Sequence, residues 1–280
     1  MTASEAYILT ASYEAAVTWN SLQTESSTNG HAVKPATVEA PGGPIHYMTE
    51  DISIRDAASV ILVRDRDTRP RVLMGQRSRQ AVFMPGVFVF PGGAVDDGDA
   101  RVNLQRGVEA PCRDRLRDGG NDSLARALQA AAIREVSEET GLLIGCPGQW
   151  ASDAPCGWEI FRDNACLPSA NGFRFVFRAI TPVGAPRRFD ARFFLVDAET
   201  AIYGKHLDDF SGAADELSEL RWVPFEDTRS LRIAFITALA LETAAPLIVH
   251  DEPPTIVPCI EGDREQRLRN ARTDRDRFIF

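Results

Sequence analysis

The stretch Arg134-Glu135-Val136-Ser137-Glu138-Glu139-Thr140-Gly141-Leu142 places three glutamates within five positions, directly after an alanine- and leucine-rich run. On a helix, Glu135 lies three and four residues from Glu138 and Glu139, so the three carboxylates share one face. Like charges at this spacing destabilise a helix by roughly 0.2–0.5 kcal/mol per pair. A divalent cation would reverse that cost, because hard cations bind carboxylate oxygens. The stretch therefore indicates either a solvated acidic helix end or a metal site.

The residues before this stretch predict one long helix over 122–140. Its apolar stripe recurs at helical spacing and comprises Leu124, Leu128, Ala131, Ala132 and Val136. Asn121 or Asp122 is suited to the N-cap, and Gly141 is suited to the position just after the last turn. The glutamates thus fall in the last two turns of an amphipathic helix.

Short apolar runs on both sides of this helix predict the strands of a sheet. They cover residues 57–63, 71–76, 87–90, 173–180, 189–196 and 219–225. A second long helix is predicted over 226–244, whereas 100–120 and 145–172 read as irregular segments. Each of the two helices needs a separate apolar surface on which to bury its stripe. The order therefore predicts an α/β fold in which a mixed sheet lies between helices.

Composition excludes several classes of protein. The chain has 280 residues, of which 44% are hydrophobic and 25% charged, as in ordinary globular proteins. Its net charge of -9 disfavours non-specific binding to nucleic acid, which requires a basic surface. No apolar run approaches the ~20 residues of a membrane span. The five cysteines include no CxxC pair and the four histidines are scattered, so zinc is disfavoured. We expect a cytoplasmic protein with no nucleic-acid or membrane partner.

The chain divides into three parts. Residues 1–50 form an N-terminal extension, with the spacing of a short amphipathic helix over 3–22 and a linker composition over 24–44. Partial order is expected there, with a docking arm or a homodimer contact as the alternative. Residues 51–250 form the compact domain, and residues 251–280 a charged surface tail.

Two stretches together resemble the signature of the Nudix hydrolases. The box of that family is G-x5-E-x7-R-E-U-x-E-E-x-G-U, where U is apolar, and residues 134–142 match its second half at every specified position. Phe90-Pro91-Gly92-Gly93 is similar to the start of the box. The resemblance covers residues 56–245. It implies a Nudix-type α/β/α sandwich that hydrolyses small nucleotide substrates with Mg²⁺ or Mn²⁺.

The first half of the box departs from the family pattern. Counting from Gly93, the glutamate position is occupied by Asp99, and 34 residues instead of seven separate it from Arg134. An insertion at about 100–121 therefore splits the box. Asp96 and Asp97 are rival candidates for the role of the missing glutamate.

The resemblance assigns roles to the acidic residues. Glu135 and Glu139, followed by Glu138, are the expected metal ligands. Glu138, Glu135 and Arg134 form the expected catalytic group, and Arg134 is spaced to pair with Glu138 and orient it. The general base is either a box glutamate or an acidic residue of a later loop. Glu216 and Glu219 are the later candidates, with a solvated charge as the alternative for each.

Other residues are expected to contact the substrate. Arg77 is expected to bind phosphate, since a guanidinium suits bidentate contacts, and a salt bridge at a strand edge is the alternative. Gly92 and Gly93 would let backbone groups reach the metal or the phosphate. Trp222 reads as a core residue, with adenine stacking as the alternative. Arginines of the insertion form either a basic flap over the substrate or a solvated loop; they are Arg101, Arg106, Arg113, Arg115 and Arg117.

The residues before Gly92 indicate a branch of the family. They are similar to the coenzyme A diphosphatase signature L-L-T-x-R-[SA]-x3-R-x3-G-x3-F-P-G-G at Leu73-Met74, Arg77-Ser78, Gly86 and Phe90–Gly93. Gly75 and Val82 depart from it. Thr181-Pro182 and Arg187-Arg188-Phe189-Asp190 are similar to the animal peroxisomal acyl-CoA branch, whose tail signal this sequence does not match.

The signature favours hydrolysis of CoA or acyl-CoA to 3′,5′-ADP and (acyl-)phosphopantetheine. The alternatives are a diphosphatase acting on NADH, ADP-ribose or another dinucleotide, and a catalytically weak binding or regulatory module.

Overall fold

The computed structural model describes residues 53–78, 85–117, 120–151, 153–183, 185 and 187–261. The expected N-terminal extension over 1–50, Val82 of the signature, and residues 262–280 of the expected tail lie outside the described residues. No helix in the described part of the chain is both long and apolar enough to cross a membrane.

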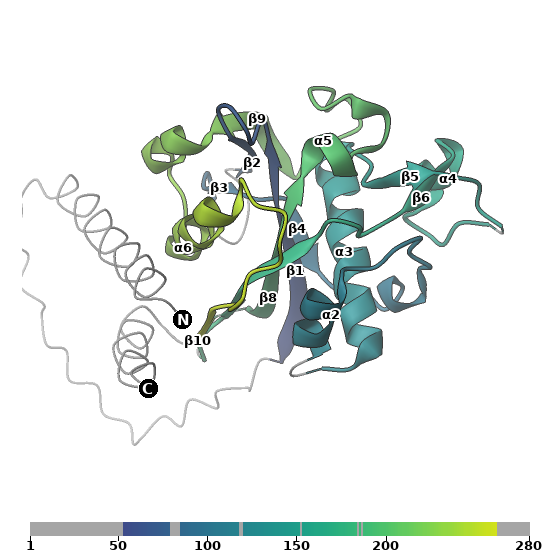
Figure 1. The fold of residues 1–280 in the computed structure, drawn as a ribbon, viewed down its shortest axis with the longest axis horizontal. Coiled ribbons are helices and arrows are strands. Elements are labelled where there is room, and N and C mark those ends of the chain that lie inside the picture. Colours follow the sequence, from purple (N-terminus) through teal and green to yellow (C-terminus); the bar gives the residue numbers. More distant parts are fainter. Residues whose placement is uncertain are drawn as a thin grey trace, which may run out of the picture.

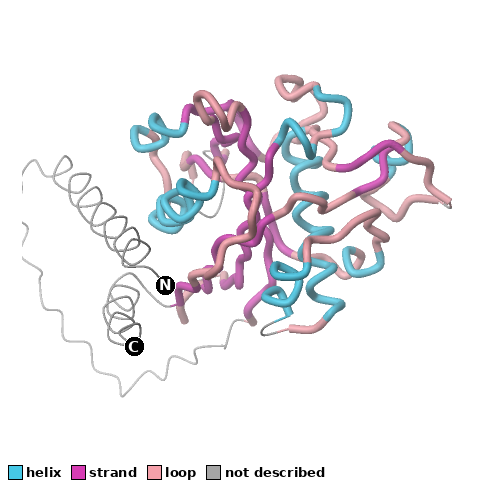
Figure 2. Tube along the Cα trace, in the orientation of Figure 1, coloured by secondary structure: helices cyan, strands magenta, loops and turns pink. Residues whose placement is uncertain are grey.

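A mixed sheet forms the centre of the domain (Figures 1 and 2). Its order is β10-β7-β8-β1-β2-β3, with β4 paired to β1 and β9 paired to β2. β1 and β8 are parallel, whereas β1 and β2 form an antiparallel hairpin. The bounds are β1 Ile54–Arg64, β2 Arg71–Arg77, β3 Phe88–Val89, β4 Gly92–Ala94, β7 Arg174–Ile180, β8 Arg188–Asp197, β9 Leu217–Pro224 and β10 Cys259–Glu261.

Alternate residues of β1 face two different cores. Val60 and Leu62 pack into the core on one side of the sheet, and Ile61 and Val63 into the core on the other. Successive side chains of a strand point to opposite faces, so a strand covered on both sides reads as a continuous apolar run. This explains the continuous apolar sequence of residues 60–63, and the two cores confirm helices on both faces.

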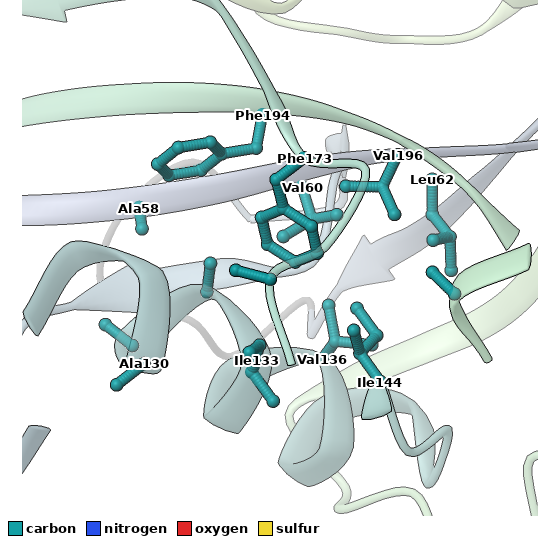
Figure 3. Packing of buried hydrophobic residues seen from close by; sticks show 14 of the residues in the cluster. Ala58, Val60, Leu62, Ala130, Ile133, Val136, Ile144, Phe173, Phe194 and Val196 are labelled. Carbon is teal, nitrogen blue, oxygen red and sulfur yellow. The ribbon is translucent and has the colours of Figure 1, made fainter. Parts of the chain in front are cut away.

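Helix α3 (Asp122–Thr140) covers one face with the stripe predicted for it. Leu128, Ala132 and Val136 are fully buried, and Figure 3 shows Ile133 and Val136 facing Val60 across this core. The Asn121 side chain accepts a hydrogen bond from the Leu124 amide at 2.9 Å, which confirms the N-cap. Gly141 has a φ of 76°, and its amide bonds to Ser137 O.

The insertion is more regular than predicted. It begins with η1 (Asp99–Arg101) and contains α2 (Ala110–Arg117), which packs against α3 and β7. Cys112 and Leu116, four residues apart, are both buried in the core, and proline is well tolerated in the first turn, where Pro111 lies. The prediction of an irregular segment was wrong because dense charges around these two residues mask a short apolar face.

The predicted loop over 145–172 also contains regular elements. Strands β5 (Gly145–Pro147) and β6 (Cys166–Pro168) form a separate two-stranded sheet, and α4 (Glu159–Asp163) lies between them in sequence. Trp158 and Phe161 anchor this segment in the core beside α3. Farther along the chain, α5 (Ala198–Ala201) and η2 (Tyr203–Lys205) follow β8.

The predicted second long helix over 226–244 is two separate helices. These are η3 (Phe225–Ser230) and α6 (Phe235–Ala244), followed by η4 (Ala245–Leu247). Leu231 is extended, and the amide of Phe88 bonds to Arg232 O at 2.9 Å, so the connecting residues pair with β3. Helix α6 covers the other face of the sheet (Figure 1). The predicted tail also contributes β10, whose Ile260 packs against the same core.

We expect Asn121→Ala to lower the free energy of unfolding by about 1 kcal/mol, because the amide of Leu124 loses its acceptor. Asn121→Asp keeps an acceptor at the same position and should change stability much less. Urea denaturation of the two variants beside wild type measures the difference. Equal losses would show that the cap bond does not stabilise α3.

Candidate functional site

The C-terminal half of α3 and the glycines of β4 meet over β1. The Gly92 amide donates a hydrogen bond to Glu139 Oε2 at 2.8 Å. A Cβ on Gly93 would lie 2.4 Å from Glu135 Oε1, and a Cβ on Gly92, whose φ is 155°, would lie 2.4 Å from Ala58 O. Glycine is therefore required at position 92 by the close approach to the β1 backbone, whereas a side chain at position 93 would displace the Glu135 carboxylate. The sequence placed them near the metal or phosphate, and the structure places them directly against the glutamates.

Burial makes the carboxyl groups of the two inner glutamates, Glu135 and Glu139, unusually weak acids. Glu139 is 3% exposed, and burial raises its pKa to about 8. The Gly92 amide lowers this pKa, whereas the charges of Glu135 and Glu216 raise it further. Burial likewise raises the pKa of Glu135 to about 7, against the opposing charge of Arg134. Desolvated carboxylates that repel one another favour the protonated form unless a cation is present.

Arg134 is the centre of the polar contacts and is 7% exposed. Its Nε and Nη2 donate to the two oxygens of Asp99 at 3.0 and 3.1 Å, and Nη2 also donates to Ala94 O at 3.0 Å. Its Nη1 donates to Glu135 Oε1 at 2.8 Å and to Glu138 Oε2 at 3.0 Å. These five bonds match the five N–H groups of a guanidinium. Burial alone would lower the pKa of Arg134, but the bond to Asp99 and the surrounding carboxylates raise it above its ordinary value.

Asp99 is the aspartate that meets the box helix. It is 1% exposed, and its Oδ2 also accepts a bond from the Asp96 amide at 2.8 Å. Asp96 approaches Arg134 only at 3.8 Å with a side chain that is 62% exposed, and Asp97 is exposed. Asp99, which makes this buried contact with Arg134, comes before α2 in the sequence. The insertion therefore begins after the residue that the site needs.

The donor chemistry of this cluster suits a hard divalent cation. Glu135 and Glu139 are buried carboxylates that lack sufficient positive charge, and their oxygens are the ligands that Mg²⁺ or Mn²⁺ prefers. Among the described residues, no three His, Cys, Asp or Glu side chains are already arranged as a set of ligands. Their carboxylates instead bond to Arg134 and to the Gly92 amide.

Arg77 and Glu216 lie next to the cluster at neighbouring strand ends. Arg77, the last residue of β2, is paired with Leu217 of β9, so Glu216 is adjacent. The charge of Arg77 lowers the pKa of Glu139, and the charge of Glu216 raises the pKa of both inner glutamates. The structure thus brings together all the predicted site residues and, of the two later acidic candidates, adds Glu216.

Glu219 instead belongs to a bulge. Met74 pairs with Arg221 and Gln76 pairs with Ser218, so two residues of β9 lie opposite Gly75. Glu219 has a φ of 49° in this bulge. A Cβ on Gly75 would lie 2.8 Å from Leu217 Cβ, which accounts for glycine at this departure from the family signature.

Two loops that the sequence did not assign to the site border the end of α3. The Ala214 amide donates to Glu138 O at 2.8 Å. On another loop, a Cβ on Gly157 would lie 3.6 Å from Glu138 Oε1. Gly141 and Gly212 also pack closely, since a Cβ on Gly141 would lie 2.9 Å from Gly212 Cα. Glycines such as Gly157 and Gly212 could have indicated close contacts from the sequence. Only the fold shows that the element they approach is α3.

Two of the five insertion arginines, Arg115 and Arg117, make hydrogen bonds within the fold. Arg115 donates to the backbone oxygens of Pro254 and Thr255, and Arg117 to Asp114 and Asp122. Trp222 is half-buried, donates to Leu207 O at 2.8 Å and packs against the core, as its predicted role requires.

We expect Asp99→Ala to lower the free energy of unfolding by about 3–5 kcal/mol, because it leaves the buried guanidinium of Arg134 without its bidentate partner. Asp96→Ala is the matched control and should cost less than about 0.5 kcal/mol, since that side chain is exposed. Urea denaturation tests both variants. Similar losses would contradict the assignment of Asp99 as the partner.

Without divalent cations, we expect stability to fall between about pH 4.5 and about pH 8. Folding raises the pKa of Glu135 to about 7 and of Glu139 to about 8 from an ordinary 4.5, so the folded state binds protons that the unfolded chain has released. Their contribution is full below about pH 4.5 and is lost as the pH rises to about 8. Thermal unfolding in EDTA measures this, and Glu139→Gln should flatten the slope. An unchanged slope would refute the shift for Glu139.

Comparisons with known proteins identify similar sequences and structures. No family model matches the chain. A Caenorhabditis elegans protein provisionally named nudix hydrolase 7 is 32% identical over 185 residues, which are 61% of this chain and 52% of that protein. The chain thus spans about half the length of this curated relative. The crystal structure of a NUDIX hydrolase from Alicyclobacillus acidocaldarius has a TM-score of 0.53 and 25% identity, covering 71% of this chain and 97% of that one. The chain therefore has the Nudix fold, and its sequence and structure are similar to those of Nudix hydrolases.

Proposed function

We propose that this chain hydrolyses a diphosphate linkage in a nucleoside diphosphate derivative, with the help of Mg²⁺ or Mn²⁺. The observation that carries the proposal is the pair of buried glutamates, Glu135 and Glu139, held against Gly92 and Gly93. Hydrolysis of a diphosphate requires an in-line attack by water while negative charge on phosphate is neutralised. A bound divalent cation supplies that neutralisation and lowers the pKa of a bound water.

Each residue of the cluster has a role that follows from its surroundings. Glu135 and Glu139 hold the cation, because their buried carboxylates are short of positive charge. Arg134 fixes the orientation of Glu135 and Glu138 by hydrogen bonds from its guanidinium, which Asp99 holds in place. A fixed support keeps ligand oxygens in place without reorganisation during the reaction.

The remaining contacts concern water and phosphate. The Glu138 side chain is 44% exposed while still bonded to Arg134, so it reaches solvent and completes the ligand set or accepts a proton from water. Glu216 is the alternative proton acceptor, since it lies beside both inner glutamates. Arg77 provides positive charge next to Glu139, where a substrate phosphate would approach.

CoA or acyl-CoA is the favoured substrate, with 3′,5′-ADP and (acyl-)phosphopantetheine as products. Support comes from the signature residues Arg77 and Gly86, whose backbones are hydrogen-bonded. The Arg77 amide bonds to Val87 O, and its carbonyl accepts from the Gly86 amide, both at 3.0 Å. Gly86 has a φ of 68°, a backbone conformation that favours glycine. The departures at Gly75 and Val82 keep NADH, ADP-ribose or another dinucleotide as the alternative substrate class.

A substrate panel tests the proposal. With Mg²⁺ or Mn²⁺, we expect CoA esters to give 3′,5′-ADP and a phosphopantetheine by mass spectrometry, faster than NADH or ADP-ribose is cleaved. The reverse order would identify a dinucleotide enzyme. Nucleotide binding without turnover of any substrate would indicate a binding module.

Glu139→Gln should reduce turnover by more than about a hundredfold, because an amide is a poor substitute for a carboxylate ligand. Glu199→Gln is the matched control, since Glu199 is an exposed carboxylate in α5, and it should leave turnover unchanged. Circular dichroism checks that both variants fold. An active Glu139→Gln variant would exclude Glu139 as a metal ligand.

A further inference from the structure

An apolar groove lies on the face of the sheet opposite the glutamate cluster. It has a volume of about 590 Å³ and is formed by η3, α6 and the turn after η4. Its apolar walls include Phe225, Ile233, Leu241, Ile248 and Val249. Val249 is 55% exposed, although it lines the groove together with the core residues Leu241 and Ile248. The volume falls within the roughly 300–1,000 Å³ of ligand-binding clefts.

Glu242 of α6 gives the groove a specific chemical requirement. Its Oε2 is buried and has no hydrogen-bond donor among the described residues. Burial raises the pKa of Glu242 to about 7, and the charge of Arg229 opposes this rise. A buried carboxylate oxygen without a donor is unfavourable, so an occupant that brings a donor or a cation is favoured. The groove is thus suited to a chain that combines a cation with large apolar side chains.

Residues 262–280 have this combination and directly follow β10. Ile260 of β10 packs against the same core cluster as Leu241 and Ile248, and the described chain stops one residue later. Six arginines and four acidic residues occur in 262–280, which include the run Arg277-Phe278-Ile279-Phe280. At roughly 3.3–3.6 Å per residue, this segment reaches any part of α6.

Residues 262–280 differ in charge from the N-terminal residues, the other long segment outside the described residues. Residues 1–30 contain no lysine or arginine but include Glu5, Glu14 and Glu25. Their negative charge would therefore repel the carboxylate of Glu242. Attachment to the same chain also gives 262–280 a high effective concentration at the groove.

We propose that residues 262–280 bind this groove of their own chain. An arginine of the segment donates to Glu242, and Phe278 and Phe280 pack against the apolar walls. The binding is independent of the hydrolase activity, because the groove and the glutamate cluster lie on opposite faces of the sheet.

Hydrogen exchange of the full chain, read by mass spectrometry of peptides, tests the proposal. Amides within 262–280 should exchange more slowly in wild type than in an isolated peptide of the same sequence. Glu242→Gln should speed their exchange about tenfold, because one charge-assisted hydrogen bond is weakened. Phe278→Ala combined with Phe280→Ala should have a similar effect, and both changes should increase binding of an apolar dye. Glu199→Gln, in α5, is the control and should change neither.

Four results would overturn the proposal. Exchange of 262–280 in wild type at the rate of the free peptide would show that the segment does not bind. Unchanged protection in Glu242→Gln would place it elsewhere. Protection that grows with protein concentration would identify a second copy as the occupant. Protection lost from residues 1–30 would identify the other segment. Amides of α3 should keep their protection in every variant, which separates loss of docking from loss of the fold.

Discussion

The buried contact between Arg134 and Asp99 is the constraint on which the site depends. A guanidinium in the interior must satisfy all its donors, and here it does so with Asp99, a backbone carbonyl and two glutamates. This requirement ties α3 to η1 and β4. Glu135 and Glu138 are consequently held by the guanidinium of Arg134. The carboxylates of Glu135 and Glu139 face the glycines of β4.

Local patterns were sufficient to predict the parts of the fold that local forces determine. Helix α3 has the predicted bounds, and Asn121 and Gly141 end it as expected, because caps and stripes depend on neighbouring residues only. Strand β1 was predicted correctly because it is apolar on both faces. Contacts between distant segments decide the rest. Residues 231–234 leave the predicted helix to pair with β3, and β10 exists only because β7 has a free edge.

The same distinction applies to the site. The sequence grouped Arg134 with the box glutamates because a helix fixes their spacing. It did not distinguish Asp99 from Asp96 and Asp97, since three neighbouring aspartates differ only in which one η1 turns toward the core. The nearness of Glu216 depends on the pairing of β2 with β9.

The position of the insertion has a consequence for how the chain tolerates change in length. Lengthening the connection from seven to 34 residues adds only about 1.4 kcal/mol of loop-closure entropy, because that cost grows with the logarithm of length. Burial of Leu116 alone recovers a similar amount, about 1.5–3 kcal/mol. The apolar contacts of the segment between Asp99 and α3 therefore offset the cost of its length. Since Asp99 precedes this segment, the domain can accommodate new sequence here without moving a site residue.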